Sequence, residues 1–159
     1  MTQLILNPKP LRLFEDREQD NGYNYGYANA IAVSSDGRRM VAASTSLVRL
    51  WDMREGILLK RLEGHGWIKV NALAVSRDGR LIASGDGQGR LIAWDLNIGE
   101  PLTQPIIAHT SGIPSLAFSP DATLLVTSSS VNSDFSFLPL IAIFPHQAMR
   151  TLKSWSQLI

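Results

Sequence analysis

The stretch that decides the fold is "LIASGDGQGRLIAWD", residues 81–95. Two apolar runs are separated by the glycines Gly85, Gly87 and Gly89, and the pair Trp94–Asp95 closes the segment. Such a loop either binds phosphate or forms a tight turn. Both the dinucleotide fingerprint and the P-loop require a glycine where this chain has Arg90, and the residues that follow have the character of a strand, which offers no helix N-terminus to phosphate. We therefore interpret the glycines as a hairpin turn.

Similar segments lie on both sides of this hairpin. Three stretches align, "AIAVSSDGRRMVAAS" (30–44), "ALAVSRDGRLIASGD" (72–86) and "SLAFSPDATLLVTSS" (115–129), and their aspartates are 42 and 43 residues apart. The pairs Trp51–Asp52 and Trp94–Asp95 are 43 residues apart, and His65 and His109 are 44 apart. Three independent markers with one period indicate an internal repeat.

Each repeat is expected to consist of short strands. In the middle repeat, apolar runs at 70–75, 81–84, 90–96 and 101–108 are separated by turn residues. The run at 90–96 is apolar on both of its faces, as in a strand that is covered on both sides. The fold class is therefore all-β and antiparallel.

This pattern resembles the WD-repeat β-propeller family, in which each blade is a four-stranded sheet. The resemblance covers about residues 11–130 and is best over 57–108, with "GH" (64–65), "SRDG" (76–79), "ASG" (83–85) and "WD" (94–95). It implies a partial propeller over 1–130 with repeats over 11–52, 57–96 and 101–130, in which 11–14 is an outer strand. Because propellers close with typically four to eight blades, we expect an incomplete, open array.

The resemblance also implies a hydrogen-bonded network in each repeat, built from the histidine, a serine or threonine, an aspartate and the tryptophan. In the middle repeat these are His65, Ser84, Gln88 in the aspartate position and Trp94, with Asp86 as an alternative to Gln88. The first repeat has Arg17 and Ala42 in the histidine and serine positions and keeps Trp51–Asp52. The third has His109 and Thr127, but Val131 and Phe137 stand in the aspartate and tryptophan positions. Asp95 completes the set of structural residues.

Two irregularities interrupt the repeats. The first repeat has six extra residues between 17 and 29, and the pattern stops after "TSSS" (127–130). We expect 131–159 to be a divergent tail outside the repeats, and either an altered reading of the gene or a genuine divergent end accounts for it.

Composition excludes several functions. The chain has 159 residues, a formal charge of +1 and no cysteine, so neither nucleic-acid binding nor thiolate chemistry is expected. We expect no signal peptide, no membrane segment, no cofactor and no metal, and an intracellular location in cytoplasm or nucleus. The two repeat histidines fall in different blades without a ligand partner, and no catalytic constellation emerges. The chain is therefore not expected to be an enzyme.

The expected function is a protein-interaction scaffold that presents loops on one propeller face. Candidate binding residues are Trp67, Lys69, Tyr23, Tyr25 and Tyr27. For Trp67 the alternative is that it folds onto its own blade, and for the tyrosines that they fill a loop. Two other possibilities stay open: a fragment of a larger array without independent function, and self-association that covers open blade faces. An enzyme is the disfavoured alternative, because no catalytic constellation emerges.

Overall fold

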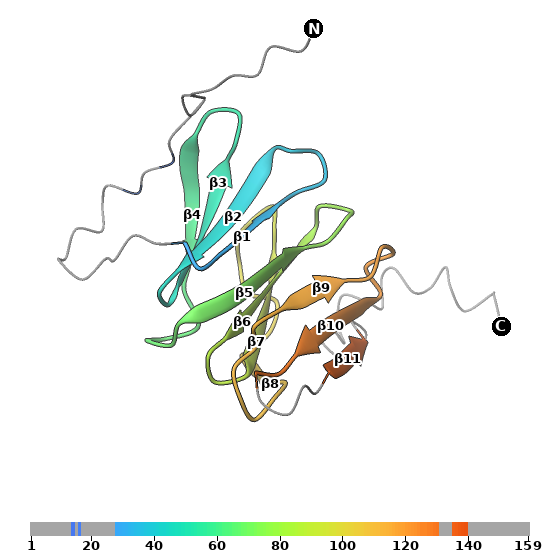
Figure 1. Ribbon diagram of the computed structural model, residues 1–159. Helices are drawn as coiled ribbons and strands as arrows, with labels where there is room; N and C mark the ends of the chain where they lie inside the picture. The colour runs from blue at the N-terminus through green and yellow to red at the C-terminus, as the bar shows by residue number, and fades with distance from the viewer. Residues whose placement is uncertain (1–13, 15, 17–27, 131–134, 140–159) are drawn as a thin grey trace, which may run out of the picture.

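The computed structural model describes residues 14, 16, 28–130 and 135–139, and these residues form three antiparallel sheets in chain order (Figure 1). The first sheet consists of β1 (Ala30–Val33), β2 (Arg39–Ser44), β3 (Leu47–Asp52) and β4 (Ile57–Leu62). The second consists of β5 (Val70–Val75), β6 (Leu81–Asp86), β7 (Arg90–Asp95) and β8 (Ile106–Ile107). The third consists of β9 (Leu116–Phe118), β10 (Leu124–Ser128) and β11 (Phe135–Pro139). Four-stranded antiparallel sheets of this kind are blades of a partial propeller, and the sheets of the described residues do not close into a ring.

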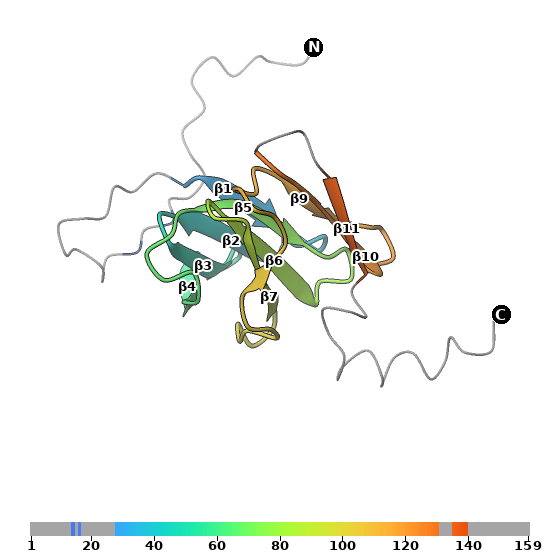
Figure 2. The ribbon, with the colours of Figure 1, turned by 90° about the horizontal axis from the view of Figure 1, so that it is seen from below.

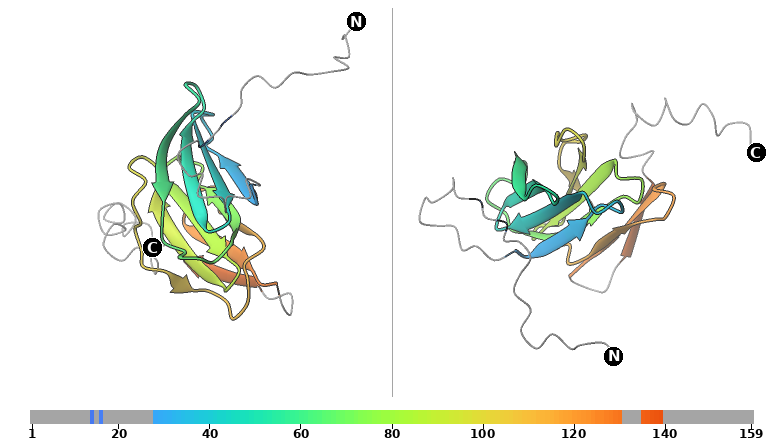
Figure 3. Two further views of the ribbon diagram at one scale, coloured as in Figure 1. Left: turned by 90° about the vertical axis from the view of Figure 1, so that its left-hand side faces the viewer. Right: turned by 90° about the horizontal axis from the view of Figure 1, so that it is seen from above.

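The sheets lie face against face, with β1, β5 and β9 side by side (Figures 2 and 3). We call the face of a sheet that is turned toward the next sheet along the chain its forward face, and the opposite face its rear face. Each interface therefore joins a forward face to a rear face. The strand alternation of period two assigns the side chains of every strand to these two faces.

The apolar core lies in the two interfaces between the sheets. Small side chains of the first forward face, among them Ala43, pack against large side chains of the second rear face, among them Ile82 and Trp94, which are fully buried. The second interface repeats this arrangement, with Ala83 on the forward face and Leu125 on the rear face. Burial of one large apolar side chain contributes about 1.5–3 kcal/mol, so stacking between neighbours is the main source of stability.

The turn between the first two strands of each sheet is built in the same way. A serine hydroxyl donates to the aspartate two residues later, at 2.6 Å, 2.5 Å and 2.6 Å in the three sheets. The residue after the aspartate has a positive φ, and it is Gly37, Gly79 and Ala122 in turn. Ala122 is therefore held at φ 56° in a conformation that glycine adopts at no steric cost.

Replacement of Ala122 by glycine is expected to stabilise the protein by about 0.5–1 kcal/mol. Left-handed backbone costs a side-chain-bearing residue about 1–2 kcal/mol, and the greater freedom of glycine in the unfolded chain offsets only part of this. The midpoint of urea unfolding measures the gain. The same denaturation of Ala108→Gly, at a position without positive φ, should show a loss, and a loss in both variants would contradict the explanation.

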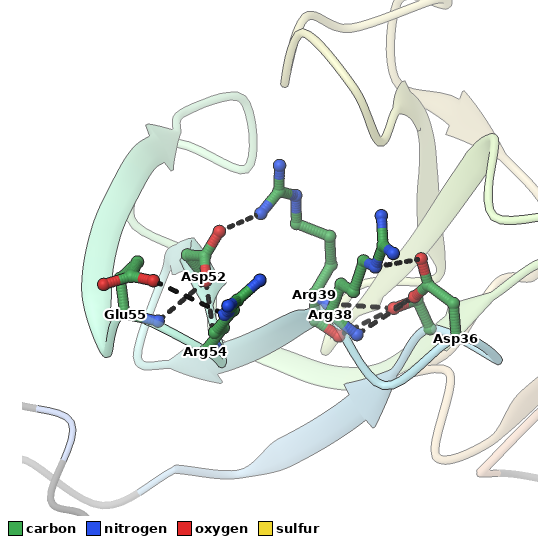
Figure 4. Close-up of polar contacts among 7 residues, drawn as sticks. Asp36, Arg38, Arg39, Asp52, Arg54 and Glu55 are labelled. Carbon is green, nitrogen blue, oxygen red and sulfur yellow. Dashed lines mark hydrogen bonds and ion pairs between the residues drawn. The ribbon is translucent and has the colours of Figure 1, made fainter.

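The aspartate of each Trp-Asp pair closes the turn that follows the third strand. Asp52 accepts the amides of Arg54 and Glu55, each at 2.9 Å, and pairs with Arg39 across the sheet (Figure 4). In the second sheet Asp95 accepts the amides of Asn97 and Ile98 at 2.8 Å and 3.2 Å. The aspartate of the pair is therefore a turn-capping residue in both sheets.

The structure differs from the sequence expectations at three places. The expected strand at 101–108 is reduced to β8 and a bridge between Trp94 and Pro101, because two prolines interrupt it. β11 lies inside the segment 131–159 that was expected to fall outside the repeats, and it pairs with all of β10. By register Leu138, and not Phe137, stands opposite Leu125, as Trp94 stands opposite Ile82. The divergent sequence hides this strand because it lacks the Trp-Asp marker.

Candidate functional site

Three connections meet at one end of the sheets: residues 63–69 between β4 and β5, 87–89 between β6 and β7, and 108–115 between β8 and β9. Backbone hydrogen bonds join them, from the Gly87 amide to the Lys69 carbonyl at 2.9 Å and from the Ile113 amide to the Asp86 carbonyl at 2.9 Å. We call this end of the described sheets the loop face. Its loops are fixed to one another, so the sheets hold them as a rigid surface.

A buried network supports the first of these loops. His65 is completely buried, and its Nδ1 lies 2.9 Å from Oδ2 of Asp86, while its Nε2 lies 2.7 Å from Oγ of Ser84. The indole Nε1–H of Trp94 donates to the same Ser84 oxygen at 2.8 Å. The network therefore connects the 63–69 loop to β6 and β7 through four buried side chains.

Burial and hydrogen bonding fix the charges in this network. Burial lowers the pKa of His65 below its ordinary value, although the hydrogen bond to Asp86 acts in the opposite direction. Burial acts to raise the pKa of Asp86, but hydrogen bonds from His65, the backbone amides and Arg90 outweigh it and leave that pKa below its usual value. A neutral imidazole then donates from Nδ1 to an ionised carboxylate and accepts the Ser84 hydroxyl proton at Nε2.

Gln88 does not have the role that the sequence analysis gave it. Asp86 is the acidic partner of His65, and Gln88 is exposed and donates only its backbone amide to Oδ1 of Asp86, at 2.9 Å. The assignment of Gln88 was wrong because it relied on the residue spacing of the family. The pairing of the strands, which the spacing does not reveal, places the turn so that Asp86 at the end of β6 faces His65. The alternative partner Asp86 is correct.

Arg90 is a member of this site that the sequence analysis missed. Its Nε donates to Asp86 at 2.8 Å, and its Nη2 donates to the His65 carbonyl at 2.7 Å. Asp86 thus holds a histidine and an arginine at once. The signal in the sequence was the pair of opposite charges four residues apart, Asp86 and Arg90, on the two sides of the glycine turn. Arg90 was considered only as the residue that replaces a glycine of the phosphate-binding motifs.

Acidification is expected to destabilise the protein through His65. Because the pKa of His65 is lowered in the folded state, the unfolded chain takes up the proton first, and stability falls as the pH drops below about 6.5. The slope contributed by one such proton is at most about 1.4 kcal/mol per pH unit. Urea unfolding of the wild type and of His65→Gln, between about pH 7.5 and about pH 5.5, measures it. A wild-type slope as shallow as that of the variant would contradict the prediction.

The third sheet keeps part of the network. Nε2 of His109 lies 2.8 Å from the hydroxyl of Thr127, two residues that the resemblance to the WD-repeat family placed in one network. Ser129 occupies the chain position that corresponds to Asp86, so this repeat has no carboxylate there. Val131 lies outside the described residues.

The first sheet replaces the network with an ion cluster. Asp16 binds Arg49 at 2.6 Å and also pairs with Arg61, and the guanidinium of Arg49 also donates to Ser44. The hydrogen bond from Arg61, followed by that from Arg49, lowers the pKa of Asp16 to about 2 against the opposing effect of burial. The side chains of Asp16 and Arg49 are nearly inaccessible to solvent, so each depends on the other for its charge.

Trp67 is the most exposed large side chain of the loop face, at 98%. The alternative that it folds onto its own sheet is therefore wrong. Lys69 is exposed as well, and its carbonyl binds the Gly87 amide. Tyr23, Tyr25, Tyr27 and Arg17 lie outside the described residues. The structure thus brings two of the five candidate binding residues to one surface.

The described part of the chain contains no group of three or more histidine, cysteine, aspartate or glutamate residues that could hold a metal ion. The same residues contain no helix that is long and apolar enough to cross a membrane. Every side-chain nitrogen and oxygen buried in them has a hydrogen-bond partner. The arrangement is that of a satisfied structural network beneath a loop surface.

Comparison with known proteins gives one family. The pattern described as "WD domain, G-beta repeat" matches residues 21–52, 56–95 and 99–135, which is more than half of the chain. The third match ends at Phe135, the first residue of β11.

Individual relatives are distant. The Small ribosomal subunit protein RACK1y of Oryza sativa subsp. japonica is 42% identical over 46% of this chain and 21% of its own length. The WD repeat-containing protein 55 of Homo sapiens is 27% identical over 69% and 28%, and the Autophagy-related protein 16 of Arabidopsis thaliana is 27% identical over 80% and 26%. The chain therefore spans about a quarter of the length of these relatives.

Proposed function

We propose, from the premise that the chain belongs to the WD domain, G-beta repeat family, that it is a non-catalytic scaffold whose loop face binds a protein partner. WD repeats typically serve protein interaction, and fold alone does not choose the partner. An intracellular location of the protein is part of the same proposal.

One observation carries the proposal: Trp67 is 98% exposed on a loop whose base is fixed. Two residues before it, His65 is held by Asp86 and Ser84, and two residues after it the Lys69 carbonyl holds the turn at Gly87. A large aromatic side chain on a rigid support loses little conformational entropy on binding, and tryptophan is enriched among the residues that dominate interface energies.

Replacement of Trp67 by alanine is expected to weaken partner binding by about 30-fold or more, which corresponds to about 2 kcal/mol or more for an interface hot spot. Pull-down with the full chain from its native cell, read by quantitative mass spectrometry, identifies proteins that the wild type recovers and Trp67→Ala loses. Ile98→Ala is the matched control, because Ile98 is 60% exposed in the turn after β7, at the opposite end of that strand. Equal recovery by all three chains would contradict the proposal.

The open array favours a second candidate, a fragment of a larger propeller without function of its own. Ile31 and Val33 of the first sheet are 60% and 47% exposed, whereas their counterparts on the same face of the other two sheets are buried or half-buried. A cooperative thermal transition of the isolated chain, without binding of the dye ANS, supports the scaffold, whereas dye binding without a transition supports the fragment. Self-association is the way in which the chain itself could cover these faces.

A further inference from the structure

The two interfaces between the sheets follow one rule of side-chain size. Apart from Arg39 and Leu81 at the start of the second strand, forward faces carry small residues on their first two strands: Ala30, Ala32, Val41 and Ala43 in the first sheet and Ala72, Ala74, Ala83 and Gly85 in the second. Rear faces carry large residues at the equivalent strand positions, Leu73, Val75 and Ile82 in the second sheet and Leu116, Phe118 and Leu125 in the third. In both interfaces, a forward face with small side chains thus packs against a rear face with large side chains.

The two outer faces, against which no described sheet packs, follow the same rule, although Phe14 and Asp16 already contact Trp51 and Arg49 on the first of them. The rear face of the first sheet carries Ile31, Val33 and Met40, which the strand register places together on one face with Trp51. The forward face of the third sheet carries Ser115, Ala117, Val126 and Ser128, together with Leu124 at the start of β10, which is 39% exposed. One outer face is therefore mainly large and the other mainly small, as in each internal interface.

The rear face of the first sheet is also prepared to receive a preceding sheet. Phe14 makes an edge contact with Trp51, with the ring centroids 5.6 Å apart. The second sheet receives such a contact from the first: Leu62, at the end of the outer strand β4, lies in the same core cluster as Trp94 of the second sheet. Phe14 thus takes on the first sheet the place that a residue from the preceding blade takes on the second.

We propose that two copies of this chain join head to tail, the forward face of each third sheet on the rear face of the partner's first sheet, to form a closed ring of six sheets. Two identical heterologous interfaces close a ring when the rotation permits it, and six sheets lie within the four to eight that propellers use. Each of the two outer faces of the described sheets then packs against a partner face, which removes the apolar exposure at Ile31 and Val33. The inference stands on the sheet faces and does not depend on the loop face.

Light scattering coupled to size exclusion tests the ring on the full chain over a dilution series. We expect a mass twice the 17.5 kDa of one chain. Ile31→Lys and Ala117→Glu each charge one of the two faces at an exposed position, so each variant alone should have the mass of a single chain. Ile98→Lys, an exposed turn position, is the control that should keep the doubled mass.

Mixing the two variants distinguishes a head-to-tail ring from other dimers. A mixed pair contains one unaltered interface and one in which lysine faces glutamate, so mixing should restore the doubled mass. A wild type with the mass of one chain would overturn the proposal. So would a dimer that only one variant disrupts, because a symmetric contact uses one face twice. If far-UV circular dichroism shows that a variant is unfolded, Val33→Lys and Ser115→Glu alter the same faces and carry the same expectations.

Discussion

Replacement of Gly89 by alanine is expected to destabilise the protein by at least about 3 kcal/mol. Gly89 has φ 81°, a conformation that costs an alanine about 1–2 kcal/mol. A Cβ at this position would also lie 2.1 Å from the carbonyl oxygen of His109 and 2.5 Å from that of Ser111. These are backbone atoms of the next loop, so the clash can be relieved only if the 108–115 connection moves. Such backbone clashes cause losses of stability larger than those of ordinary point mutations.

Gly87, two residues away in the same turn, provides the matched control. Its φ is not positive, and an added Cβ would meet only ordinary contacts, the nearest being 3.6 Å from the side chain of Asn71. Gly87→Ala should therefore change the free energy of unfolding by no more than about 0.5–1 kcal/mol. Urea unfolding of both variants at one protein concentration makes the comparison, and equal effects would show that the close approach to His109 does not matter.

Replacement of Asp86 by alanine is expected to cost about 3–5 kcal/mol, the range for breaking a buried ion pair. The variant leaves the Nδ1–H of His65 without its acceptor in a fully buried site and removes the counter-ion of Arg90. The stability of Asp86→Asn should lie between that of Asp86→Ala and that of the wild type. Its amide oxygen still accepts the hydrogen bond from His65, but the charge opposite Arg90 is gone.

Gln88→Ala is the control for this series, since Gln88 is exposed and contributes only its backbone amide to the network. We expect a change within about 0.5 kcal/mol, as for ordinary surface substitutions. Chemical denaturation of the three variants measures the order. A larger loss in Gln88→Ala than in Asp86→Ala would return the acidic-partner role to the position that the repeat spacing first indicated.

Both predictions concern the stretch 81–95, and they show how far its sequence could be interpreted. The glycines were correctly interpreted as a hairpin turn, because strand patterns on both sides and the absence of a helix are local properties. The individual roles were not accessible, because Gly89 is required by carbonyls twenty residues further along the chain. Gln88 was assigned by spacing, and a tight turn tolerates a shift of two residues that spacing does not reveal.

The sequence by itself determined the repeat period and the all-β class, since repeated patterns specify equivalent places in equivalent sheets. The contacts of His65 with Ser84 and of His109 with Thr127 followed from the resemblance to the WD-repeat family. Only the tertiary structure decided that Asp86 and Arg90 share one site, that Asp16 joins Arg49 and Arg61, and that β11 completes the edge of the third sheet. These features depend on strand register and on contacts between distant segments. Charges and side chains that meet across sheets leave no period in the chain, so sequence pattern alone does not predict them.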